Sequence, residues 1–562
     1  MNYVKKIFYT FCCLTIFCSC QKSPSDQPKA TKKTPLNTPS EIIHKAHLDN
    51  GWYSQSKEQL QKELYDNLAL AGKLFSCNIV GQDVRALIVP HAGHHYSGLC
   101  AASAYQTLLN PDTTLPLEQR KNTTIKRVII LAPSHTHFFT GIALPNYTTY
   151  QTVLGSLTVD PKSIAILQKN NLYKEFPDAH HKEHSIEVQL PFLQSTIAEF
   201  TIVPLVVGHL KDASDIDALC QRLERIIDNQ TLVVISSDFI HHGASYEYAP
   251  FSTHIIPQVR SYDSMAVNTI MQQSYYLFTN FLTQTNASIC GKEPIKLLLA
   301  LLGKKSFKQE LTGYLTGYYT SPQLQAASSR WPLKHQLLFA NVDDAQATSS
   351  VSYVGMVFAS NPVDTLTPSS PFTGYEQQAL LMLAHSTLEN NFLPAPQQLP
   401  AHLLYPIITQ SLQQPVGAFV TLTTKNGDLR GCIGNITTDQ PLYKTAQAMA
   451  YAAAFQDSRF TPLTKEELDN VTIDITVLSQ PRKIESYKDI VIGTQGIILH
   501  KYNPQGQEIG SALFLPQVAR EHGWDIETTL DALSHKAGLD YDAWQENCSF
   551  EVFDGFEIKE AK

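Results

Sequence analysis

The sequence is poor in charged residues and has no excess of positive charge. Charged residues make up 17% of the 562 residues, below the roughly 25% that is usual in soluble domains. Lys and Arg number 43 against 51 Asp and Glu, so the composition supplies no cationic surface for a nucleic-acid backbone. Hydrophobic residues make up 43%, which argues against extended disorder. At roughly 100 to 200 residues per domain, this length predicts three or four domains, or two large ones.

The first twenty residues predict an export signal rather than part of the fold. Lys5 and Lys6 precede an apolar run from Ile7 to Cys18, which is too short to span a bilayer. Cys20 ends a loose version of the bacterial lipoprotein box, so we expect residues 1–20 to be a lipoprotein-type signal peptide and Cys20 to be lipidated. Ordinary cleavage nearby and an uncleaved anchor are the alternatives. In each case the bulk of the chain is expected on the periplasmic or extracellular side of a bacterial membrane.

Two segments rich in Pro, Ser and Thr divide the rest of the chain. Residues 21–45 are expected to be a flexible tether. Residues 361–373, with three prolines, are expected to link a domain at 46–360 to a smaller one at 374–562. The remaining cysteines are too scattered for a disulfide-stapled small domain, and we expect three of them to be core residues: Cys77, Cys100 and Cys220.

The first domain is predicted to be α/β. Continuous apolar runs alternate with helical stretches, which is typical of a sheet that helices cover on both faces. The runs are Val84 to Val89, Val128 to Leu131, Ile202 to Val207, and Leu232 to Ile235. No internal repeat is present in the sequence.

The second domain is predicted to be α+β. Leu381, Ala384 and Leu388 mark one face of a helix. Two strands flanking Asn426-Gly427 predict a hairpin, and a second hairpin is expected around residues 503–506, followed by a helix near 528–537.

Polar side chains follow three of the apolar runs of the first domain directly. His91, His135 and Asp238 come at equivalent places, with His241 three residues after Asp238. The carboxyl ends of strands line the ligand crevice of an open α/β sheet, so these side chains are expected to converge. A lone histidine is usually structural, but three residues of this kind at equivalent strand ends favour a site.

These residues belong to a series of motifs that resembles the Memo family, also called AmmeMemoRadiSam system protein B. The series runs from about His47 to Ser360 and includes Gly51-Trp52-Tyr53, Pro90-His91-Ala92-Gly93, Pro133-Ser134-His135, His184-Ser185-Ile186-Glu187, Ser236-Ser237-Asp238-Phe239 and Ile289-Cys290-Gly291. The resemblance implies a fold similar to the class III extradiol ring-cleaving dioxygenases. It also implies a metal site made of two histidines and a cysteine, which are His91, His135 and Cys290 here, with Asp238 and His241 as pocket residues.

The chemistry of this set suits an open metal centre. Imidazole suits iron, copper or zinc, a thiolate adds a preference for soft metals, and three protein ligands leave positions for water, dioxygen or substrate. Because a thiolate replaces the carboxylate of the usual facial triad, ring cleavage is not carried over. Pro294 fits the first turn of the helix after Cys290, so we expect the helix dipole to lower the pKa of that thiol. The alternative is that Cys290 is a small buried hydrophobe.

Other polar residues of the first domain have less specific interpretations. His180 and His181 are expected on a solvated or rim-lining helix face. His184 and Glu187 match the family motif and are candidates for substrate contacts or for residues that support the metal ligands. None of Ser134, Ser236 and Ser237 lies in a G-x-S-x-G context, so a serine hydrolase is not supported.

Residues 374–562 resemble the AMMECR family, AmmeMemoRadiSam system protein A. The motifs are Leu429-Arg430-Gly431-Cys432-Ile433-Gly434, Asp457-Ser458-Arg459-Phe460 and Leu515-Pro516-Gln517. Arg430 and Cys432 beside a hairpin form a candidate cleft for a carboxylate or phosphate. The alternative is a tight strand with Cys432 buried. Asp457 and Arg459 are expected either to form an ion pair at the same cleft or to cap a helix.

The sequence therefore predicts a metal-dependent redox enzyme that uses iron or copper, with zinc less favoured. His241 is expected to transfer protons and Asp238 to orient it. The alternatives are a non-catalytic metal carrier or peptide-binding adaptor, and metal-assisted hydrolysis with zinc. The expected substrate is a small molecule or a peptide. A radical SAM enzyme is a candidate partner, and membrane contact is expected through a lipid anchor alone.

Overall fold

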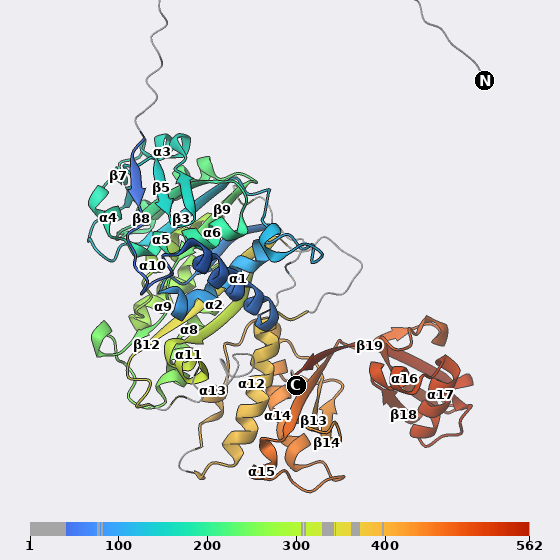
Figure 1. Ribbon diagram of the computed structural model, residues 1–562. Coiled ribbons are helices and arrows are strands. Elements are labelled where there is room, and N and C mark those ends of the chain that lie inside the picture. Colours follow the sequence, from blue (N-terminus) through green and yellow to red (C-terminus); the bar gives the residue numbers. More distant parts are fainter. Residues whose placement is uncertain are drawn as a thin grey trace, which may run out of the picture. The chain divides into compact units, whose positions relative to one another are not determined.

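The computed structural model describes residues 41–75, 79, 83–304, 307, 311–328, 342, 344–360, 371–395 and 398–560 (Figure 1). The predicted signal peptide, the lipidation site Cys20, residues 21–40 of the tether, Cys77 and residues 361–370 of the linker lie outside these ranges. Both sheets described below belong to one compact unit, Ile42–Lys562. Within the described ranges, no helix combines the length and the apolar character needed to cross a membrane.

A nine-stranded sheet forms the core of the first region. Its order is β10-β12-β2-β9-β3-β8-β4-β7, with β11 paired to β12. The four central strands β2, β9, β3 and β8 are parallel neighbours and contain the four predicted apolar runs. The strand bounds are β2 Val84–Val89, β3 Arg127–Pro133, β4 Ile142–Leu144, β7 Tyr173–Glu175, β8 Thr201–Val207, β9 Thr231–Ser236, β10 His241–His242, β11 Leu311–Thr320 and β12 Ser350–Ser360.

Helices cover both faces of this sheet. Nearly every residue of its central strands is therefore buried. The helix α2 packs on β2, β11 and β12, whereas α10 packs on β3 and β9. Cys100 on α2 and Cys220 on α7 are buried in this core, as predicted. The longer helices are α1 Lys57–Leu74, α2 His94–Tyr105, α7 Ala213–Leu223, α8 Ile255–Met271, α9 Tyr275–Thr285, α10 Lys292–Leu302 and α11 Ser321–Ser328.

Shorter elements complete the first region. A small sheet joins β1 Ile43–Lys45 in parallel to β5 Thr149–Thr152, which pairs with β6 Gly155–Thr158. The short helices are α3 Pro161–Leu167, α4 Pro177–His181, α5 His184–Glu187 and α6 Leu190–Thr196. Glu183 caps α5, since its side chain accepts a hydrogen bond from the Ser185 backbone N–H.

The second region is built on a seven-stranded antiparallel sheet in the order β14-β13-β15-β19-β17-β18, with β16 paired to β19. The long strand β19 pairs with β17 along its first half and with β15 along its second half, so it joins two lobes (Figure 1). The strands are β13 Ala418–Thr424, β14 Leu429–Asn435, β15 Val471–Leu478, β16 Arg482–Ile484, β17 Gln495–Tyr502, β18 Glu508–Phe514 and β19 Cys548–Lys559.

Each lobe has its own helices and core. In one lobe α12 and α14 pack on β13, β14 and β15, and in the other α16 and α17 pack on β17 and β18. Both predicted hairpins are present, and Gly427 takes the positive φ of 92° that the first turn requires. The helices are α12 Gly374–Asn391, α13 Ala401–Leu404, α14 Leu442–Phe455, α15 Lys465–Leu468, α16 Pro516–His522 and α17 Ile526–Lys536.

Candidate metal centre

Two histidines and a cysteine meet at one edge of the large sheet. His91 follows β2, His135 follows β3, and Cys290 lies just before α10. The strands β2, β9 and β3 are parallel neighbours, so their carboxyl ends share one edge. Gly291 allows the close approach of Cys290, because a Cβ at Gly291 would lie 2.3 Å from the Ser237 side chain. One ligand atom each from His91, His135 and Cys290 lies within 4.8 Å of the others.

Hydrogen bonds orient the ring of His91 with Nε2 toward Cys290. Nδ1 of His91 lies 2.9 Å from Oγ of Ser236. That hydroxyl donates its one proton to the Ser185 carbonyl and accepts from Nε2 of Gln189, so it must accept the Nδ1 proton of His91. Nε2 of His91 therefore carries a lone pair, 3.2 Å from the Cys290 sulfur. Burial and the neighbouring imidazoles hold the pKa of His91 well below its ordinary value, so this ring is neutral.

A carboxylate that the sequence analysis missed orients His135. Oε1 of Glu183 lies 2.9 Å from Nδ1 of His135, and Oε2 accepts from the His135 backbone N–H at 2.6 Å. Burial alone would raise the pKa of Glu183, but the hydrogen bonds from His135 lower it to about 2. An ionised carboxylate only accepts, so Nδ1 of His135 carries the proton and Nε2 the lone pair. The sequence feature that could have indicated Glu183 is its position directly before His184.

The expected lowering of the Cys290 pKa is wrong. The helix α10 does begin at Lys292, with Gly291 as its N-cap. Burial, followed by the charge of Asp238, nevertheless raises the pKa of the Cys290 thiol well above its ordinary value. The N–H of Asp238, which donates to the sulfur at 3.2 Å, and hydrogen bonds with Ser237 and the Gly291 backbone lower this pKa but do not offset the loss of solvation. A metal ion that binds this sulfur as a thiolate must therefore displace its proton.

A cavity of about 1100 Å³ opens beside these ligands. The ring centroid of His184 lies 4.4 Å from that of His135 and 4.7 Å from that of Trp52, so His184 forms part of the wall. The volume is sufficient for a small-molecule substrate. The other lining residues include Asp238, His241, Tyr96, Tyr246 and Tyr353.

Main-chain carbonyls orient His241, and the predicted orienting contact from Asp238 is wrong. Nδ1 of His241 lies 2.8 Å from the Phe239 carbonyl oxygen and 3.1 Å from that of Ser288. Because carbonyl oxygens only accept, Nδ1 carries the proton and Nε2 is the proton acceptor. The Asp238 carboxyl accepts instead from the backbone N–H of His91 at 2.8 Å, and burial raises its pKa. Asp238 therefore positions the main chain at His91.

The donor set of this centre fits a transition metal. It offers two imidazole nitrogens and a sulfur, and each ring is held through its other nitrogen, as is usual for histidine ligands. A second group within 4.8 Å consists of His135, Glu183 and His184. It fits less well, because four N–H and O–H donors already engage the Glu183 carboxylate.

The predictions for three neighbouring residues, His180, His181 and Glu187, compare differently with the structure. His180 is only 4% exposed, and both of its ring nitrogens form hydrogen bonds within the fold, so the predicted solvated or rim position is wrong. His181 is exposed, as predicted. Glu187 is fully buried and accepts hydrogen bonds from the Tyr53 hydroxyl and the Leu48 backbone. It anchors the segment before α1 and does not line the cavity.

The predicted cleft residues of the second region largely bond to one another. Arg430 donates two hydrogen bonds to Glu467, at 2.9 and 3.0 Å. Asp457 and Arg459 form an ion pair of 2.7 Å, the first of the two arrangements expected for them. Asp457 also accepts from the Cys432 backbone N–H, and Arg459 donates to the Cys432 carbonyl. A carboxylate of the chain therefore already occupies Nε and Nη2 of Arg430, which argues against the interpretation of this residue as an anion receptor, while Nη1 is buried and has no hydrogen-bond partner among the described residues.

Comparisons with known proteins match both regions. A family model described as Memo-like protein matches residues 46–330, and one described as AMMECR1 matches residues 381–558. Protein MEMO1 of Mus musculus is 31% identical over 266 residues, covering 46% of this chain and 84% of that protein. Protein memo-1 homolog of Caenorhabditis elegans is 31% identical over 275 residues, covering 48% of this chain and 73% of that protein.

One solved structure, an uncharacterized protein from Pyrococcus horikoshii, is 32% identical, with a TM-score of 0.26. The match covers 32% of this chain and 88% of that chain.

The fold and the site together define an α/β protein with a histidine and cysteine centre at its sheet edge, followed by a mixed α and β region. The chain belongs to the Memo-like protein family. An AMMECR1 region follows in the same chain, which confirms the predicted fusion. The resemblance to class III extradiol dioxygenases stays a prediction.

Proposed function

We propose that this protein is a metal-dependent redox enzyme in which His91, His135 and Cys290 hold iron or copper. The main support is the hydrogen-bond pattern of the two rings, because Nδ1 of each is engaged and Nε2 of each carries a lone pair. An ion bound there would supply redox and Lewis-acid chemistry beside the cavity. The room beside the ligands favours a substrate site over a closed carrier site.

His241 is proposed to move a proton during the reaction. Its Nδ1 proton faces two carbonyl oxygens, so Nε2 is the atom that accepts a proton from a substrate. The ring lines the cavity together with Tyr246, whose ring centroid lies 5.1 Å away. This arrangement supports general-base catalysis at the wall of the cavity.

The test is reconstitution of the purified full chain with Fe(II), Cu(II) or Zn(II), followed by elemental analysis and by oxygen uptake with and without azide. We expect one ion per chain and a spectrum that azide changes, because an enzyme needs an open coordination position. No bound metal after reconstitution would refute the proposal. A bound ion whose spectrum ignores azide would favour the carrier, and activity with zinc alone would favour hydrolysis.

Export and partnership are separate proposals. Cys20 is proposed to carry a lipid that anchors the chain on the periplasmic or extracellular side of a bacterial membrane, and a radical SAM enzyme is proposed to act in the same pathway. Labelling of cells with a fatty-acid analogue, comparing wild type with Cys20→Ser, tests the first. Signal of equal strength in the variant would exclude lipidation at Cys20.

A further inference from the structure

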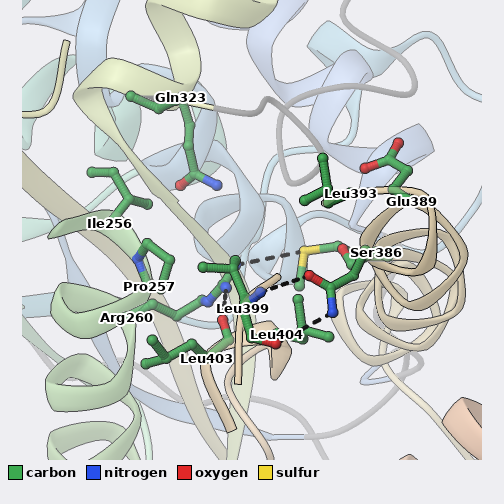
Figure 2. A pocket seen from close by; sticks show the side chains of 13 residues that line it. Ile256, Pro257, Arg260, Gln323, Ser386, Glu389, Leu393, Leu399, Leu403 and Leu404 are labelled. Carbon is green, nitrogen blue, oxygen red and sulfur yellow. Dashed lines mark hydrogen bonds between the residues drawn. The ribbon is translucent and has the colours of Figure 1, made fainter. Parts of the chain in front are cut away.

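A second pocket lies where the two regions of the chain meet, between α8 of the first and α12 and α13 of the second (Figure 2). Its volume is about 150 Å³, close to the roughly 150 Å³ of an engineered apolar cavity that binds benzene. Apolar side chains provide much of the wall, among them Ile256, Leu403 and Leu404. The pocket shares no lining residue with the cavity at the metal centre.

Arg260 on α8 brings a guanidinium into this pocket. Nη2 donates to the Leu403 carbonyl at 3.0 Å, and Nη1 donates to the Met382 sulfur at 3.8 Å. Nε is buried and has no hydrogen-bond partner. Among the described residues no Asp or Glu forms an ion pair with Arg260. Burial lowers the pKa of this guanidinium, which marks the cost of placing a charge there without a counter-charge.

We propose that this pocket binds a compact monocarboxylate with an apolar body, held by Arg260. A guanidinium presents its N–H groups as a planar fork that matches a carboxylate. The Ser386 hydroxyl, which lines the same pocket, is placed to donate a further hydrogen bond. The apolar side chains of the wall would contact the apolar body of the ligand.

The carboxylate of Glu389 disfavours a ligand that carries more than one negative charge. It is exposed and lines the pocket on the side opposite Arg260 (Figure 2). A second negative charge on the ligand would be repelled by this carboxylate, so a single carboxylate fits better than a phosphate monoester. Because helices of both regions contribute lining residues, a bound ligand would contact both and stabilise their junction.

Benzoate, with its neutral analogue benzamide, is a suitable pair of probes for the full chain. We expect benzoate to bind with a Kd of about 1 mM or below and to raise the Tm, and benzamide to bind about tenfold more weakly because it lacks the charge. Calorimetry and ligand-observed NMR measure both. Inorganic phosphate is the third probe, and tighter binding of phosphate than of benzoate would contradict the monocarboxylate.

Two variants change the pocket in different ways. Arg260→Met removes the charge, and Leu404→Trp fills the apolar wall while Arg260 is retained, so one of them keeps the test valid if the other fails to fold. Both should abolish benzoate binding. His91→Ala should leave benzoate binding unchanged, which separates this pocket from carboxylate binding at a metal ion. The proposal fails if benzoate binds equally well to both pocket variants, if benzamide matches it, or if His91→Ala abolishes it.

Discussion

The centre at the sheet edge and the cleft of the second region contrast in how their polar side chains are used. Both contain a cysteine flanked by charged or ionisable groups. At the centre, Nδ1 of each histidine is held by a hydrogen bond, Nε2 is left as a potential metal ligand, and both rings line a large cavity. In the second region, Arg430 pairs with Glu467, and Asp457 pairs with Arg459. Side chains that have a hydrogen-bond partner at one atom and an unused polar atom at a cavity indicate a reactive site, whereas side chains that pair with each other indicate a structural role.

The two cysteines show the same contrast. The Cys290 sulfur lies 3.2 Å from Nε2 of His91, a residue that lines the cavity. The Cys432 sulfur accepts from the Thr421 hydroxyl at 3.3 Å, while its main chain is held by Asp457 and Arg459. The motif that contains Cys432 is therefore explained by the conformation of β14, and the motif that contains Cys290 is not explained by packing alone.

Removal of a proposed ligand should give the largest effect. His91→Ala is expected to weaken metal binding by more than about 100-fold, because loss of an outer partner alone typically costs 10- to 100-fold. Titration with Fe(II) or Zn(II), with thermal melting to check folding, measures this. The matched control is His181→Ala, which removes an exposed histidine and should bind metal as the wild type does. Equal affinity of the two variants would contradict the ligand assignment.

Glu183→Gln tests whether the outer hydrogen bond to His135 matters. Gln keeps the size but loses the charge that holds the Nδ1 proton, so metal affinity should fall by about 10- to 100-fold. The same titration measures the change. Glu467→Gln, the corresponding substitution in the second region, should leave metal affinity unaltered. If Glu183→Gln binds metal as tightly as wild type, Glu183 serves only as the cap of α5.

The pH dependence of metal binding tests the protonation state of Cys290. Burial raises the pKa of its thiol, so binding as a thiolate should release one proton and affinity should rise about tenfold per pH unit. The window for this measurement lies above the ordinary histidine pKa of roughly 6.5. In Cys290→Ser the slope should disappear together with most of the affinity. A wild-type slope of zero would mean that the sulfur is not a ligand.

The sequence predicted elements that depend on local pattern, and it missed contacts that depend on distant segments. The apolar runs became β2, β3, β8 and β9, and Asn426-Gly427 became the turn of a hairpin, because periodicity and a positive φ are local properties. The Glu183 to His135 bond spans 48 residues and the Arg430 to Glu467 pair spans 37. The pKa of Cys290 depends on burial by the whole fold, which outweighs the local helix end.

The smallest expected effect concerns the ion pair between Arg430 and Glu467. Glu467→Gln should lower the free energy of unfolding at neutral pH by about 1 kcal/mol, since the pair is bidentate but Glu467 is partly exposed. Arg430 lowers the pKa of Glu467 to about 2, below the ordinary 4.5, so the stabilisation is complete above about pH 4.5 and is lost as the pH falls toward 2. Denaturant unfolding at several pH values measures this. Glu466→Gln, an exposed neighbour in the same helical turn, is the control. Equal stability of the two variants at neutral pH would show that the pair is not structural, and the cleft would again be a candidate anion site.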